Sequence, residues 1–271
     1  MSLKPTTSSE SQRTELPCYQ VGCSNPGEEE AKYLVLVFSD VHGPDTGNHK
    51  AFCDALQEKL GESWAVWMPD LFRGHPMAPD VGHKYFWVDW ICRLSILWAE
   101  KTRMSVPAVR EDLEHVIQPN ISASVTSIGM AGFCYGAWVI GRSLGWSNHN
   151  HQGDKPFFPT LNAGVLIHPS WRPEAATVGG GLTKQEMAKA TKTKPILLLP
   201  GKQDVDFHAT SALSQQLAQQ RNLNVNDIVV DFTHMDHGWV SRADCSQDKA
   251  LQEAQEQATQ QTADFFKKHL K

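Results

Sequence analysis

A cysteine stands between two glycines in the segment Gly132-Phe133-Cys134-Tyr135-Gly136. This spacing is typical of a nucleophile on a sharp strand-to-helix turn, where side chains two positions before and after it would clash. An apolar run at 125–130 precedes the motif and a helical pattern follows it. The N-terminus of that helix would favour a thiolate and stabilise a developing oxyanion. The motif therefore predicts a cysteine nucleophile, against the alternative of a buried cysteine in a glycine-rich turn.

An acid and a histidine follow the cysteine at places where a parallel sheet would bring them to it. Asp204 comes just after an apolar run at 195–199, and His237 comes shortly after a similar run at 228–232. Acids at the carboxyl ends of strands lie on the edge where open α/β sheets bind ligands. The order nucleophile, acid, histidine is that of the α/β-hydrolase fold. His237 would take the thiol proton and later protonate the leaving oxygen, while Asp204 would orient its ring.

Two neighbours are alternatives for these roles. Asp206 lies two residues beyond Asp204, and His234 lies three residues before His237. The Gly-x-x-Asp spacing after the strand favours Asp204, and Gly238 leaves room for a substrate beside the ring of His237. Taken singly, a loop aspartate and a surface histidine are ordinary features. The prediction depends on three elements in order, each after its own strand.

The elements that must position these residues alternate along the chain. Continuous apolar runs are typical of strands buried on both faces of a parallel sheet, and the stretches between them carry apolar residues at helical spacing. We predict strands at 33–38, 65–68, 125–130, 163–167, 195–199 and 228–232, and helices at 48–60, 83–100, 107–118, 135–144, 207–221 and the C-terminal end. This alternation predicts an α/β fold with a mostly parallel central sheet and helices on both faces.

Composition sets the domain organisation and excludes several functions. Residues 1–30 are polar and predict a flexible N-terminal arm with one short strand near 19–21, followed by a single domain at 31–271. The net charge of −5 gives no reason to expect nucleic acid or an anionic membrane as partner. No secretory signal is visible, so reduced cysteines in the cytoplasm are expected, with a Ser- and Thr-rich transit peptide as the alternative. His149 and His151 form an H-x-H pair that indicates a solvated loop rather than a metal site.

Together the motifs resemble the dienelactone hydrolase family, also called the carboxymethylenebutenolidases, and most of all its eukaryotic branch. The resemblance covers residues 33–270 and rests on Asp40-Val41-His42-Gly43, Met68-Pro69-Asp70-Leu71-Phe72-Arg73-Gly74, the cysteine motif, His168-Pro169-Ser170, Gly201-Lys202-Gln203-Asp204, and His237-Gly238-Trp239 with Arg242 beyond. It implies an α/β-hydrolase fold and a Cys-Asp-His hydrolase of cyclic and activated esters. It also implies that neither a metal nor a cofactor takes part, and that the substrate carries a carboxylate next to the lactone.

The resemblance also gives expectations for the surroundings of the triad. In the family an acid from the loop after the first strand, often Glu, holds the resting thiol; here it is the shorter Asp40. A carboxylate there would disfavour the thiolate, so Asp40→Ala is expected to make Cys134 more reactive. Trp239 replaces a common Phe and would narrow one wall of the pocket. Arg242 is expected to pair with a substrate carboxylate, or else to form a surface salt bridge.

We therefore predict a cysteine-type hydrolase that cleaves a lactone or an activated carboxylic ester. The backbone N–H groups of Tyr135 and Val41 would form the oxyanion hole. A thioester or other acyl hydrolase on the same triad is one alternative, and a non-catalytic protein with a redox-sensitive Cys134 is another. The expected partner is a small ester or lactone, with no nucleic acid or membrane, and the chain is expected to be a monomer or a weak homodimer.

Overall fold

The computed structural model describes residues 16–22, 31–78, 94–96, 98–99, 104–147, 157–170, 188 and 192–270. The helix predicted at 83–100 lies largely outside these ranges, and the histidines at 149 and 151 lie outside them altogether. Within these ranges, no helix has both the length and the apolar character needed to cross a lipid bilayer.

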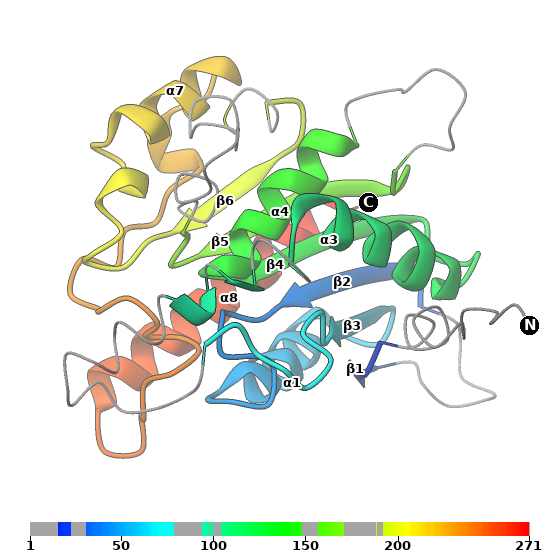
Figure 1. Cartoon of the computed structure of the whole chain (residues 1–271). Helices are drawn as coiled ribbons and strands as arrows, with labels where there is room; N and C mark the ends of the chain where they lie inside the picture. The colour runs from blue at the N-terminus through cyan, green and yellow to red at the C-terminus, as the bar shows by residue number, and fades with distance from the viewer. Residues whose placement is uncertain are drawn as a thin grey trace, which may run out of the picture.

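A six-stranded sheet forms the centre of the molecule (Figure 1). Its strands are β1 (Cys18–Val21), β2 (Tyr33–Phe38), β3 (Trp64–Pro69), β4 (Ser127–Phe133), β5 (Leu161–Ile167) and β6 (Ile196–Leu199). They lie in the order β1-β3-β2-β4-β5-β6. Only β1 runs antiparallel to its neighbour, while β2 to β6 pair in parallel. The mostly parallel sheet predicted from the sequence is therefore confirmed, and the segment predicted as an arm supplies an edge strand.

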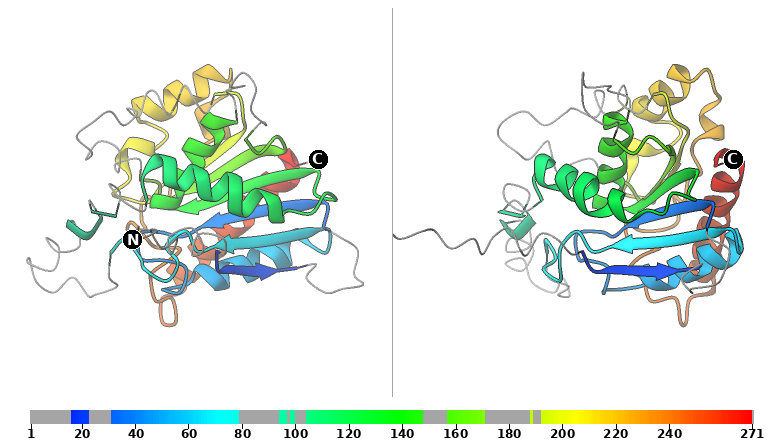
Figure 2. Two further views of the ribbon diagram at one scale, coloured as in Figure 1. Left: turned by 45° about the vertical axis from the view of Figure 1, so that its right-hand side comes forward. Right: turned by 90° about the vertical axis from the view of Figure 1, so that its right-hand side faces the viewer.

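Helices cover both faces of this sheet (Figure 2). They are α1 (His49–Leu60), α3 (Val106–Asp112), α4 (Tyr135–Trp146), α7 (Ala212–Gln220) and α8 (Lys249–His269). In the two views of Figure 2, α3 and α4 lie on one face, and α1 and α8 lie on the other. The helix predicted at 107–118 continues past α3 as a π-helical turn at Leu113–Ile117 and a 3-10 turn at Gln118–Asn120.

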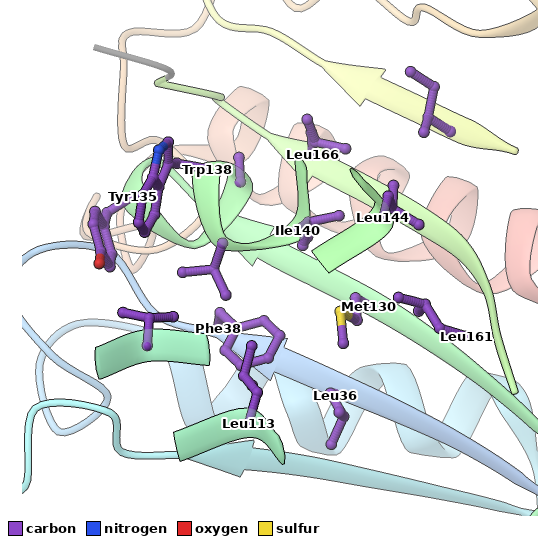
Figure 3. Close-up of a cluster of buried hydrophobic side chains, with 14 of the residues drawn as sticks. Leu36, Phe38, Leu113, Met130, Tyr135, Trp138, Ile140, Leu144, Leu161 and Leu166 are labelled. Carbon is purple, nitrogen blue, oxygen red and sulfur yellow. The ribbon is translucent and has the colours of Figure 1, made fainter. Parts of the chain in front are cut away.

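Two hydrophobic cores form because alternate residues of each strand point to opposite faces. In β2, Leu36 and Phe38 pack into the core beneath α3 and α4, whereas Val35 and Val37 pack into the core beneath α1 and α8. Figure 3 shows the first of these cores, with Leu36 and Phe38 facing the helices. All four side chains are at most 1% exposed, so the central strands are fixed from both sides. Rigid central strands hold the loops at their carboxyl ends in place.

Two sequence predictions near the end of the sheet are wrong in detail. The strand predicted at 228–232 is reduced to two isolated parallel bridges, Leu198 with Val229 and Gly201 with Phe232. A 3-10 turn ends at Asp227, immediately before this segment, whose N–H groups then bond β6 and the loop after it at two points: Val230 N donates to the Leu198 carbonyl and Phe232 N to the Pro200 carbonyl, each at 2.9 Å. The helix predicted at 207–221 begins instead at Ala212, because the Ser211 hydroxyl caps it by accepting from Ser214 N. The residues before it form a separate 3-10 turn at Val205–Phe207.

Candidate active site

Cys134 occupies a strained turn between β4 and α4. Its φ of 50° and ψ of −104° lie in a region that L-residues rarely adopt. A Cβ on Gly132 would lie 2.5 Å from the carbonyl carbon of Gly136, and one on Gly136 would lie 2.2 Å from the carbonyl oxygen of Phe38. Only glycine fits at either position, because the atoms in the way belong to the backbone. The turn leaves Cys134 half-buried at the carboxyl edge of the sheet, directly before the first turn of α4.

The structure brings Asp204 and His237 together at the same edge. His237 Nδ1 lies 2.5 Å from Asp204 Oδ1, and the second carboxylate oxygen accepts from Gly201 N at 2.8 Å. Asp204 is buried, and this pair of bonds fixes its carboxylate. The Cys134 side chain lies close enough to the imidazole to interact with it and raise its pKa. Asp204 rather than Asp206 is thus the acid that contacts His237.

The electrostatics of His237 follow from these two contacts. Burial lowers the pKa of His237, but the neighbouring Cys134 sulfur and the Asp204 carboxylate raise it more, to about 10. The side chain of His237 is still 35% exposed, so one part of the ring faces solvent or a substrate. An imidazole held between a thiol and a carboxylate in this way can take a proton from one and is stabilised as a cation by the other.

The register of the sheet starts the two segments that carry the predicted oxyanion donors side by side. Phe38 at the end of β2 pairs with Gly132 near the end of β4, so the loops that follow these strands begin side by side. Val41 lies in the first loop and Tyr135 is the first residue of α4. Within the described part of the chain, the Val41 N–H makes no hydrogen bond, while its carbonyl accepts from Ala78 N at 3.1 Å. An N–H group held in this way is available to a developing oxyanion.

Asp40 has different partners from those expected from the sequence. Its carboxylate accepts from His42 N at 2.9 Å and from Ser241 Oγ at 3.1 Å, and lies 3.6 Å from His49 Nε2. Among the bonds of the described residues, none joins Asp40 to Cys134. The Asp40 carboxylate is therefore held by its own loop and by Ser241. A direct effect of Asp40 on the Cys134 thiol stays a prediction.

Trp239 and Arg242 also differ in their surroundings. Trp239 is 1% exposed and packs against Phe232 with ring centroids 4.4 Å apart, so it belongs to the core rather than to a pocket wall. Arg242 lies one turn beyond His237, and its N–H donates to the Gly238 carbonyl at 2.8 Å. Its aliphatic stem passes over Gly238, where an added Cβ would lie 3.4 Å from Cδ. The half-buried Arg242 side chain therefore runs close to the histidine.

Three residues that the sequence analysis did not assign lie around the histidine. Gln203 accepts from His237 N at 2.6 Å and donates to Asp236 Oδ1 at 2.7 Å, which fixes the loop that carries the ring. His168 and Ser241 are both fully buried, and the His168 ring contacts His237 with centroids 4.8 Å apart. The His-Pro-Ser motif was the only sequence signal for His168, Gln203 stood unassigned within the Gly201-Lys202-Gln203-Asp204 motif, and no local pattern pointed to Ser241.

An open hollow of about 770 Å³ lies on the same side of the sheet, next to the loop after β2. Its wall includes Pro76 and Met77, one residue before the Ala78 N–H that bonds Val41. Leu94 and Trp98 line it as well and are 45% and 63% exposed. Among the described residues no group of three or more His, Cys, Asp or Glu side chains is placed to hold a metal ion.

A mostly parallel sheet, with a cysteine on a strained strand-to-helix turn and an acid and a histidine at its carboxyl edge, is the arrangement of the α/β-hydrolase fold. The model of the dienelactone hydrolase family matches residues 23–270, and the chain belongs to that family. It is therefore a carboxylic ester hydrolase.

Individual proteins are similar to the chain over most of its length. The chain is similar to the hydrolase pyvD of Aspergillus violaceofuscus, with 24% identity over 259 residues that cover 95% of this chain and 88% of that protein. A dienelactone hydrolase-like promiscuous phosphotriesterase from metagenomic libraries has a TM-score of 0.58 at 12% identity, covering 95% of this chain and 94% of its own. The dienelactone hydrolase of Anabaena variabilis has a TM-score of 0.50 at 16% identity, covering 94% and 93%. These solved structures share the fold.

Proposed function

We propose that the protein cleaves a lactone or an activated carboxylic ester with Cys134, His237 and Asp204 as its catalytic triad. The observation that supports this most directly is the continuous set of contacts from the Cys134 thiol to His237 and from His237 to Asp204 at 2.5 Å. A nucleophile within reach of a base, with the base oriented by a third group, is the arrangement that nucleophilic acyl transfer requires.

The reaction would proceed in two halves. Cys134 Sγ, with its proton on His237, attacks the carbonyl carbon, and the N–H groups of Tyr135 and Val41 stabilise the oxyanion. When the tetrahedral intermediate collapses, the proton on His237 passes to the leaving alkoxide and an acyl thioester remains on Cys134. His237 then deprotonates a water molecule that attacks the thioester, and Cys134 leaves as a thiolate. Asp204 stabilises the imidazolium at each proton transfer.

Two features beside the loops that carry the predicted site residues suggest what the substrate carries. The hollow beside the Val41 loop is lined by Met77, Leu94 and Trp98, which suits an apolar acyl or alcohol group. Arg242, whose stem crosses Gly238 beside the catalytic histidine, suits a carboxylate at the other end of the substrate. We therefore favour an ester or lactone that combines an apolar portion with an acid group. The proposed acyl chemistry uses side chains and backbone N–H groups of the protein together with a water molecule, and it calls for neither a metal nor a cofactor.

We further propose that the protein works in the cytoplasm on a small molecule, as a monomer or a weak homodimer. The four described cysteines are all free thiols, which suits a reducing compartment. The net charge of −5 gives no reason to expect nucleic acid as a partner.

The proposal is tested with aryl acetates and a panel of lactones, comparing the wild type with Cys134→Ala. Turnover should fall to background in Cys134→Ala, because the covalent step is lost. Cys245→Ala is a matched control, since Cys245 is also a half-buried free thiol, and it should keep full activity. Mass spectrometry should detect the acyl group on the Cys134 peptide of the wild type. Full activity in Cys134→Ala would exclude the mechanism.

A further inference from the structure

A set of buried polar groups lies behind the triad and ends at the ring of His237. Asp40 is 2% exposed, and Ser241 and His168 are fully buried. Ser241 Oγ donates to Asp40 Oδ2 at 3.1 Å and lies 3.2 Å from His168 Nε2. The His168 ring contacts the ring of His237, with their planes at 71°. We call Asp40, Ser241 and His168 the polar network; it connects a buried carboxylate to the histidine that would carry the catalytic proton.

The hydrogen bonds of this network have a fixed direction. The single hydroxyl proton of Ser241 goes to Asp40, because an ionised carboxylate can only accept. Ser241 Oγ must therefore accept from the Nε2–H of His168. His168 is then a neutral ring with its lone pair on Nδ1, and within the described ranges that atom has no hydrogen-bond partner. Burial lowers the pKa of His168 well below its usual value, and the neighbouring His237 and His49 lower it further.

We propose that Asp40, Ser241 and His168 are positioning residues that hold the ring of His237 toward Cys134. The ring of His237 packs edge-on against the ring of His168, so the orientation of one ring limits the orientation of the other. The bond to Ser241 occupies Nε2 of His168 as a donor and fixes the orientation of its ring. Without that bond, the buried Nε2–H of His168 has no acceptor, which favours a rotation of the His168 ring.

The loop that carries Ser241 is held independently of its hydroxyl group. Asn48 N donates to the Ser241 carbonyl at 2.6 Å, and Asn48 Nδ2 donates to the Ala243 carbonyl at 2.9 Å. Removing the Ser241 hydroxyl therefore breaks the polar network and leaves the backbone anchors in place. Ser143 offers a matched control, because it is equally buried and, in the described part of the chain, its hydroxyl has no hydrogen-bond partner.

The inference rests on the proposed function, so the experiment combines turnover with a measurement that needs no substrate. It compares Ser241→Ala, Ser241→Thr and Ser143→Ala by kcat and KM on an aryl acetate, and by the rate at which iodoacetamide alkylates the Cys134 peptide. In Ser241→Ala we expect kcat and the alkylation rate to fall by about tenfold, the effect of one lost buried hydrogen bond, with KM within about twofold. Ser241→Thr should recover most of both rates, and Ser143→Ala should match the wild type.

The outcomes separate the two proposals. If the wild type turns over no ester, the proposed function fails, while the alkylation rates still report on the polar network. If Ser241→Ala keeps wild-type kcat and alkylation, or if Ser143→Ala loses as much, the positioning role is refuted. If Ser241→Ala does not fold, Asp40→Asn tests the proposal instead, because Asp40 lies at the other end of the polar network. Asp40→Asn should lower kcat and the alkylation rate in the same way.

Discussion

Replacing Asp204 by asparagine should nearly abolish turnover while leaving the fold intact. Asp204 Oδ2 accepts from Gly201 N at 2.8 Å, and Oδ1 contacts His237 Nδ1 at 2.5 Å. In Asp204→Asn, the amide oxygen must stay toward the Gly201 N–H, because an NH₂ group there would face another donor. The NH₂ group then faces His237 and donates to Nδ1, so the ring takes its proton on Nε2. An Nε2–H imidazole cannot accept the proton of Cys134.

The wrong tautomer sets the size of the effect. The same change of acid to amide costs about 10⁴-fold in kcat in the serine-protease triad, and we expect a loss of about 10³ to 10⁴ here. The assay is aryl acetate hydrolysis at neutral pH, together with a thermal melt to show that the fold persists. Asp206→Asn is the matched control, because Asp206 lies in the adjacent 3-10 turn, and it should stay within about twofold of the wild type. If Asp204→Asn retained more than about a tenth of the wild-type kcat, the tautomer argument would be refuted.

Two further predictions concern the turn and the charge of the histidine. Gly136→Ala should lower both the stability and the kcat, because the added Cβ would lie 2.2 Å from a backbone oxygen. In Gly164→Ala the added Cβ meets only the ends of the Ile140 and Leu144 side chains, so this variant should keep its kcat. Melting temperatures and kcat of both variants test this, and equal kcat values would contradict it. The pKa of His237 is raised to about 10 in the folded chain, above a value near 6.5 in the unfolded chain. The stabilisation by the protonated histidine is therefore fully present below about pH 6.5 and is lost as the pH rises toward 10. The melting-temperature difference between the wild type and His237→Gln should shrink across that range, and a constant difference would show that the histidine is not charged in the fold.

Local patterns in the sequence were enough to predict most of the sheet and the order of the site residues. The apolar run at 33–38 is buried on both faces as β2, and the two glycines around Cys134 are needed because backbone atoms approach within 2.5 Å. Each of these features depends on residues close together along the chain. The Gly-x-x-Asp spacing likewise distinguished Asp204 from Asp206, because Asp204 caps its own turn through Gly201 N.

The surroundings of the triad depend on distant contacts that no local pattern contains. Ser241 meets Asp40 across 201 positions and His168 across 73. Trp239 illustrates the same limit: its place after His237 and Gly238 suggested a pocket wall, but the packing of Phe232 takes its ring into the core. The motif therefore predicts which residues meet, while the folded chain decides which way each side chain points.

Asp40 is the residue for which the sequence and the structure predict opposite results. A carboxylate against the sulfur would disfavour the thiolate, so its removal would speed the alkylation of Cys134. In the structure the Asp40 carboxylate accepts a hydrogen bond from Ser241. In Asp40→Asn, an NH₂ group would face Ser241 Oγ, and the Ser241 hydroxyl proton would turn toward His168. The direction of each hydrogen bond in the polar network would then be reversed. We therefore expect the alkylation of Cys134 in Asp40→Asn to slow several-fold and kcat to fall with little change in KM. Asp45 is an exposed acid on the same loop, and Asp45→Asn should have no effect on either rate. Faster alkylation in Asp40→Asn would mean that the charge acts on the sulfur directly.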